Sequence, residues 1–154
     1  MITLAPSLIN LDSYVFIQLV ANTNLAFEES KLERKLLIDD LEVHIENQEI
    51  DDNNVSIVSM AVRTKPETES NLPCHFSIEV VAKFALDEKL VVDISTGNVN
   101  ALTFLKLSTM NLLYGIIRDQ LFTMTAKLYR GALFLPSCTF SLTIDSGENA
   151  NPSE

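Results

Sequence analysis

The sequence is short of the residue types on which many specialised sites depend. Its 154 residues include four glycines, five prolines, two cysteines, two histidines and no tryptophan. Four glycines leave little material for the glycine-rich loops that hold phosphate groups. The two cysteines, Cys74 and Cys138, form no C-x-x-C pair and lie in apolar, strand-like surroundings, so we expect buried free thiols rather than a disulfide.

Basic residues are also scarce. The chain has 11 lysines and arginines against 21 aspartates and glutamates, which gives a formal net charge of −10. Because nucleic acids and anionic membranes are bound chiefly through basic side chains, this balance argues against both as partners. A hydrophobic content of 47% predicts a folded core. We expect a single domain over residues 1–144 and a polar, disordered tail over residues 145–154.

Long apolar runs are absent. The most apolar stretch lies between Leu112 and Leu121, and Arg118 and Asp119 interrupt it before it could span a bilayer. The first residues lack the basic and apolar regions of a secretory signal. We therefore expect a soluble, cytoplasmic protein.

Alternation of apolar and polar residues, which is typical of half-buried strands, recurs in four stretches. We expect strands at residues 14–27, 41–46, 55–64 and 76–86. Turn-forming acidic, asparagine and proline residues separate the last three strands, and these connections are short enough for hairpins. The last three strands are therefore predicted to form an antiparallel meander.

The pattern changes after Gly97 to apolar residues at three- and four-residue steps. This spacing predicts a long amphipathic helix, capped at its start by Asn98 or Asn100. Gly115 and the β-branched residues lower helix propensity, so a break within residues 107–111 stays open. The predicted fold class is α+β: a four-stranded antiparallel sheet, then the long helix, then a short extended segment.

No arrangement of reactive side chains stands out. His44 shares one predicted strand face with Glu42 and Glu46, but no further histidine or cysteine completes a metal site, and a solvated polar face is the simpler interpretation. Cys74 and His75 are adjacent, and adjacent strand residues point to opposite faces. Since no nucleophile elbow, phosphate loop or zinc-protease motif occurs, we expect neither enzymatic activity nor a cofactor.

Seven acidic residues lie between Asp39 and Asp52, with no lysine or arginine among them. Two interpretations stay open. Negative charge keeps an edge strand from aggregating, and the same charge could form a docking face for a basic partner.

The predicted helix carries more apolar residues than one sheet can cover. Apolar positions between Leu102 and Ile117 extend over more than half of its circumference. The surplus must be buried in an oligomer or against a ligand such as an apolar polypeptide segment.

Three local motifs resemble, in order, those of the bacterial protein-export chaperone SecB and its relatives. The first, Asn24-Leu25-Ala26-Phe27-Glu28, resembles Asp-Ile-Ser-Phe-Glu in the family's first strand. The second is Ile78-Glu79-Val80 in the fourth strand. The third is a longer series at nearly the family's spacing: Asn111-Leu112-Leu113-Tyr114, Arg118-Asp119, Thr125, Arg130-Gly131, Leu135-Pro136 and Phe140.

The resemblance implies a chain that assembles into dimers and then tetramers and that holds unfolded precursor polypeptides in apolar grooves without ATP. Members of the family deliver these clients to the export motor SecA. Carried onto this sequence, the resemblance implies a motor-docking acidic face at Glu28 and Glu79, while Asn24 stands where the family has Asp. It places the polypeptide groove at six apolar residues: Leu25, Phe27, Leu112, Tyr114, Ile117 and Leu121.

The C-terminal part departs from the family pattern, which continues into a second helix and a motor-binding tail. Here residues 138–144 predict a strand, and the remaining residues are acidic, with Gly, Asn and Pro but no basic residue. Relatives that serve as dedicated chaperones of one client, such as an antitoxin, also lack that tail. A dedicated chaperone is therefore an alternative to a general export chaperone.

Two functions of other classes are alternatives to the chaperone. A structural adaptor would use the apolar helix only as an oligomer interface and would not bind unfolded chains. A small thioesterase of the hotdog fold is disfavoured, because in that fold the helix lies near the start of the chain, whereas here the predicted strands come first.

Overall fold

The computed structural model describes residues 7–25, 36–67, 72–127 and 132–142. Its elements are, in order, strand β1 (Ile9–Thr23), a short 3-10 helix (Ile38–Asp40), strands β2 (Leu41–Asn47), β3 (Val55–Thr64) and β4 (Cys74–Leu86), and helices α1 (Glu88–Ser95) and α2 (Val99–Thr125). The strands form one antiparallel sheet in the order β1-β4-β3-β2. The predicted α+β fold class is confirmed, and so is the meander of β2, β3 and β4.

The first strand begins and ends earlier than predicted. β1 spans Ile9–Thr23 instead of residues 14–27, and Leu25 lies just beyond its end. The pairing of β1 with β4 shifts register twice, between Leu11 and Ser13 and between Phe16 and Gln18. Each shift exchanges the faces to which alternate side chains point, so a strict two-residue period could not fix the extent of this strand.

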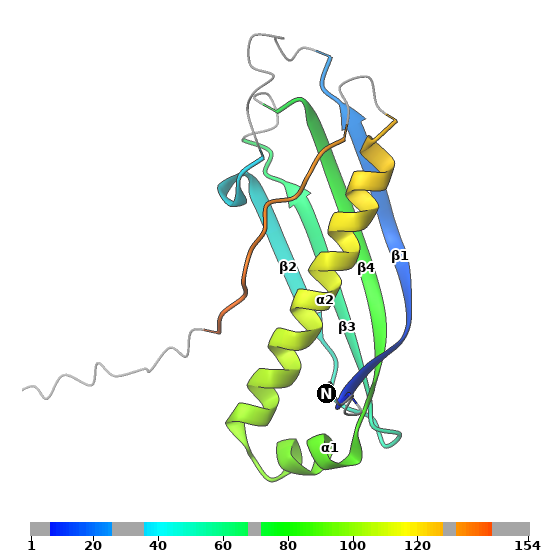
Figure 1. Cartoon of the computed structure of the whole chain (residues 1–154), viewed down its shortest axis with the longest axis vertical. Coiled ribbons are helices and arrows are strands. Elements are labelled where there is room, and N and C mark those ends of the chain that lie inside the picture. Colours follow the sequence, from blue (N-terminus) through cyan, green and yellow to red (C-terminus); the bar gives the residue numbers. More distant parts are fainter. Residues whose placement is uncertain (1–6, 26–35, 68–71, 128–131, 143–154) are drawn as a thin grey trace, which may run out of the picture.

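The two faces of the sheet differ in character. On β3 and β4 the side chains that face α2 are buried, and those on the opposite face are partly exposed and more polar. Figure 1 shows α2 crossing the first face diagonally, and α2 packs against β4, β1 and β3. The sheet therefore has one packed face and one open face.

Side-chain caps define the two helices. Asp87 accepts a hydrogen bond from the backbone of Lys89 at the start of α1, a helix that the sequence analysis did not predict. Gly97 takes a positive φ of 83° between the helices, a conformation that favours glycine. Asn98 then caps α2 as predicted, accepting from the backbone of Asn100 and Ala101. α2 is unbroken through residues 107–111, so the break that the sequence left open does not occur.

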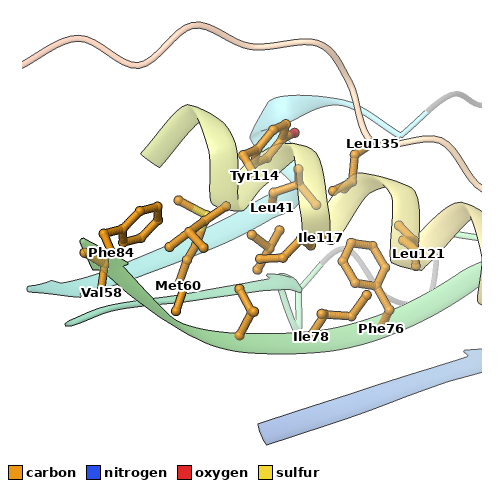
Figure 2. Close-up of a cluster of buried hydrophobic side chains, with 14 of the residues drawn as sticks. Leu41, Val58, Met60, Phe76, Ile78, Phe84, Tyr114, Ile117, Leu121 and Leu135 are labelled. Carbon is orange, nitrogen blue, oxygen red and sulfur yellow. The ribbon is translucent and has the colours of Figure 1, made fainter. Parts of the chain in front are cut away.

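The core lies between α2 and the sheet. Figure 2 shows side chains of α2 meeting those of the strands, with Leu135 entering from the C-terminal segment. Fully buried members include Met60, Ile78, Phe84, Leu113 and Leu121. Because α2 supplies a buried residue on nearly every turn, it closes most of the inner face of the sheet.

The C-terminal segment is extended but is not a strand. Residues 132–142 have neither helical nor strand structure, so the predicted strand at 138–144 is wrong over its described part, residues 138–142. Residues 143 and 144 and the predicted tail at 145–154 lie outside the described residues. The segment runs over the face of the sheet beside α2 rather than along a strand edge (Figure 1), so it does not join the sheet. None of the helices in the described ranges is long and apolar enough to cross a membrane.

Candidate functional site

Strand β1 exposes large apolar side chains on both of its faces. Ile17 is 61% exposed, Val15 60% and Tyr14 50%. Tyr14 pairs with Ala82 on the helix side of the sheet, whereas Val15 pairs with Val81 on the opposite side. The register shift next to Ile17 leaves a third apolar side chain outside the regular alternation. An apolar strip thus follows the middle of the strand.

β1 is also an edge strand that carries few of the features that usually prevent edge-to-edge pairing. Within the described residues, its only partner in the sheet is β4, so the backbone groups of its outer edge face away from the sheet. Its 15 residues carry a single charge, Asp12, which lies 3.7 Å from the ammonium group of Lys83. Soluble proteins usually protect long edge strands with lysines, prolines or a covering element. The edge is therefore suited to pair with another polypeptide.

The outer face of α2 forms a second apolar surface. Phe104 and Phe122 lie eighteen residues apart, which is about five helical turns, and so they point to the same side. Both are exposed, as is Leu112, a predicted groove residue, at 41%. The surplus of apolar positions predicted for this helix is therefore visible on its surface.

The predicted groove residues do not form one surface. Leu25 is 88% exposed beyond the end of β1, and Phe27 lies outside the described residues. Tyr114, Ile117 and Leu121 are core residues on the sheet side of α2. The periodicity predicted the helix correctly but could not state which of its apolar sides faces the sheet.

Tyr114 lies where α2 meets the C-terminal segment. Its hydroxyl donates a hydrogen bond to the carbonyl oxygen of Pro136 at 2.8 Å, and its ring meets that of Phe140 edge to face, with centroids 5.6 Å apart. Burial raises the pKa of Tyr114, and the neighbouring thiol of Cys138 raises it further. The hydroxyl therefore stays protonated and remains a hydrogen-bond donor.

Of the two predicted motor-docking residues, Glu79 lies on the open face of the sheet and Glu28 lies outside the described residues. Glu79 borders a shallow hollow of about 370 Å³ together with Glu42, Glu46 and Arg63. Arg63 donates a hydrogen bond to Glu42 at 2.6 Å, which lowers the pKa of that carboxyl. With three carboxylates against one guanidinium, the hollow suits a basic group better than an acidic one.

Several members of the acidic cluster have structural roles. A carboxylate oxygen of Asp40 accepts from the backbone of Leu37, and Asp51 accepts from the backbone of Asn53 and Val55 in the turn before β3. His44 lies 3.1 Å from Glu46, and the described residues contain no cluster suited to a metal ion. Both thiols are free: Cys74 is buried and Cys138 is half-buried.

A second hollow, of about 490 Å³, was missed because its wall includes the unpredicted α1. It lies between α1, α2 and the connection from β2 to β3, and its apolar lining includes Ile50, Val91, Ile94, Leu102 and Leu105. Glu49, Asp51 and Lys106 contribute the charged part of its wall. The apolar spacing of residues 88–95, with Asp87 as an N-cap, could have predicted α1 and with it this wall of the hollow.

Comparison with known proteins yields structural likenesses only. No protein-family model matches the sequence, and no curated protein matches it. The structure is similar to the Mycobacterium tuberculosis Rv1957 SecB-like chaperone in complex with a ChAD peptide from the Rv1956 HigA1 antitoxin, at 13% identity and a TM-score of 0.49 over 83% of this chain and 86% of that chain. It is also similar to a Streptococcus agalactiae protein of unknown function, at 15% identity and a TM-score of 0.45 over 84% and 97% of the two chains.

Proposed function

We propose that this protein is a chaperone that holds unfolded polypeptides without ATP. The observation that carries the proposal is the strip of exposed apolar side chains on β1, together with a second apolar surface on the outer face of α2. A solitary exposed leucine needs no explanation, but a 15-residue edge with one charge and several exposed aliphatic and aromatic residues does.

These surfaces suit an unfolded chain for two physical reasons. The open edge of β1 offers backbone groups that any extended polypeptide can pair with, whatever its sequence. The apolar side chains then gain roughly 25 cal/mol for each Å² of apolar surface that the client buries against them. Many such weak contacts, made together, give a useful total affinity. Neither step needs a nucleotide, a cofactor or catalysis.

The same edge also supports self-association. Two copies of β1 could pair edge to edge, and the apolar faces of α2 could then join dimers into a tetramer, as the resemblance to SecB implies. If assembly covered both surfaces completely, the protein would be a structural adaptor. Client binding in the assembled state is therefore the property that separates the two functions.

Delivery of clients to an export motor is part of the proposal. Glu79 and the neighbouring carboxylates Glu42 and Glu46 form a docking face for a basic partner on the side of the sheet opposite α2. A dedicated chaperone of one client, such as an antitoxin, would use the same apolar surfaces without a motor. Salt-sensitive binding of the motor SecA that is lost in Glu79→Lys would favour the first role.

The decisive experiment follows the aggregation of a chemically unfolded enzyme by light scattering, with increasing amounts of this protein and no nucleotide. We expect suppression that saturates at a fixed ratio of protein to client. Leu112→Asp should weaken client affinity about tenfold, because it places a charge in the apolar surface of α2. Asn111→Asp, at an adjacent exposed position, is the matched control and should suppress aggregation as the natural protein does.

Two outcomes would contradict the proposal. One is an absence of suppression at severalfold excess of a folded, oligomeric protein, which would favour the adaptor. The other is equal suppression by both variants, which would remove α2 from the binding surface. Tyr114→Asp is unsuitable for this test, because it would bury a charge in the core and unfold the chain.

A further inference from the structure

The hollow between α1, α2 and the connection from β2 to β3 lies at the end of the sheet where β4 leads into α1 (Figure 1). The exposed apolar residues of β1 and α2 that carry the proposed function do not line it. Its volume of about 490 Å³ falls in the range of roughly 300–1,000 Å³ that is usual for small-molecule sites. The hollow is therefore a separate candidate site, and its size suits a small molecule.

Much of the wall of this hollow is apolar. α1 contributes Val91 and Ile94, and the first turns of α2 contribute Leu102 and Leu105. Ile50 adds a fifth apolar residue from the connection between β2 and β3. Leu105 is 6% exposed and Leu102 is 38% exposed, so the apolar wall runs from the core to the surface. Such a wall takes up an apolar group and removes its surface from water.

A buried hydroxyl without a partner belongs to the same wall. Ser56 of β3 lines the hollow and is only 3% exposed. Its side chain makes no hydrogen bond to any residue that the structure describes. A hydroxyl that is buried loses its hydrogen bonds to water, and leaving it unpaired costs free energy. Ser56 therefore offers a donor and an acceptor to a polar atom of a molecule that enters the hollow.

Opposite charges line the hollow without pairing. Lys106 comes from α2, whereas Glu49 and Asp51 come from the connection between β2 and β3. One carboxylate oxygen of Asp51 already accepts two backbone N–H groups in the turn. Among the described residues, neither Lys106 nor Glu49 has an ion-pair partner. A ligand with both a carboxylate and an ammonium group complements both charges, whereas a ligand with one charge also meets a like charge.

We propose that this hollow binds a small zwitterionic ligand of the amino-acid class with a large apolar side chain. The side chain of the ligand packs between α1 and α2. Its carboxylate pairs with Lys106, and its ammonium group pairs with Glu49. A polar atom within the ligand's side chain, such as the N–H of an indole, donates to the hydroxyl of Ser56. The site is independent of polypeptide holding, because the two functions use different residues.

L-Tryptophan is a suitable probe, because the chain contains no tryptophan and indole fluorescence therefore reports the ligand alone. The full-length protein is titrated into the probe, and the anisotropy of the indole fluorescence is measured. We expect saturable binding of one ligand per chain. Indole-3-propionate lacks the ammonium group and tryptamine lacks the carboxylate, so each should bind about tenfold more weakly than L-tryptophan.

Three substitutions test the contacts one at a time. Lys106→Met should weaken L-tryptophan binding about tenfold and should not weaken tryptamine, which has no carboxylate. Glu49→Gln should weaken L-tryptophan binding and should not weaken indole-3-propionate, which has no ammonium group. Ser56→Ala should weaken L-tryptophan binding about fivefold and leave 2-naphthylalanine, which has no indole N–H, unchanged. Lys89→Met, at an exposed position of α1 outside the hollow, is the matched control and should change none of these affinities.

Two outcomes would overturn the proposal. One is an absence of saturable L-tryptophan binding by the folded protein, which would mean that water alone fills the hollow. The other is binding that indole-3-propionate or tryptamine matches, or that Lys106→Met and Glu49→Gln leave unchanged, because the apolar group alone would then be recognised. Aggregation suppression should persist in all four variants, since none of the four residues belongs to the apolar surfaces of β1 and α2. The amino-acid site and the chaperone function can therefore fail separately.

Discussion

Leu135 and Leu121 are almost equally buried, yet we expect their replacement by alanine to have different costs. Leu135 is 2% exposed and Leu121 is fully buried, and both belong to the same apolar cluster. Leu121 is fixed in the hydrogen-bonded turns of α2, whereas Leu135 belongs to a segment without helix or strand structure. The two substitutions therefore compare a core residue with a docked one.

The expected loss in free energy of unfolding differs between the two substitutions. Leu→Ala removes three carbon atoms, worth about 2.4 kcal/mol at roughly 0.8 kcal/mol each. At Leu121 a cavity term adds to this, because the helix cannot collapse into the space, and the free energy of unfolding should fall by about 3–4 kcal/mol. At Leu135 the loss is capped at the free energy with which the segment docks. A tenfold bias toward the docked state corresponds to about 1.4 kcal/mol, and we expect that loss.

Urea unfolding followed by circular dichroism measures both values. We expect a single cooperative transition for each variant, with the midpoint of Leu135→Ala between those of Leu121→Ala and the natural protein. A loss of 3 kcal/mol or more for Leu135→Ala would refute the reasoning. The segment would then be an integral part of the core rather than a docked peptide.

Three further predictions concern other parts of the molecule. Burial raises the pKa of Tyr114, so the folded protein should lose stability as the pH rises above about 10, where the tyrosine ionises in the unfolded chain. Tyr114→Phe should reduce this loss by up to about 1.4 kcal/mol per pH unit, measured as the free energy of urea unfolding at pH 9 and 11. A Cβ added at Gly115 would meet no atom within 4 Å, so Gly115→Ala should stabilise α2 by about 1 kcal/mol and raise the melting temperature by about 3 °C. If the variant instead lost its oligomeric state, a second copy would have to pack against the helix at Gly115. Ile17→Lys should weaken self-association by about tenfold or more in analytical ultracentrifugation. Asn10→Lys, which adds the same charge at the N-terminal end of β1, should not.

The sheet was predictable where one face is buried and the strands are regular. β3 was predicted to the residue, at Val55–Thr64, because its inward and outward positions alternate without interruption. β1 was predicted less well, because two register shifts break its period and because both of its faces carry apolar residues. The feature that blurred the pattern is the same one that makes this strand a candidate binding edge.

The exposure of the residues predicted for the polypeptide groove could not be predicted from the sequence. Tyr114, Ile117 and Leu121 are buried between α2 and the sheet, whereas Leu112 is 41% exposed. Periodicity fixes the angle between side chains around a helix, but it does not fix the rotation of the helix against a sheet. α1 was missed because its eight residues are few for a helical period to be recognised.

The C-terminal segment shows most directly what a sequence pattern can and cannot state. The sequence predicted an extended, strand-like chain there. Residues 132–142 are extended, but they pair with no strand, and the more buried positions change phase at Pro136. The pattern is the same whether the partner is a strand edge or a groove, because only the side chains are recorded in it.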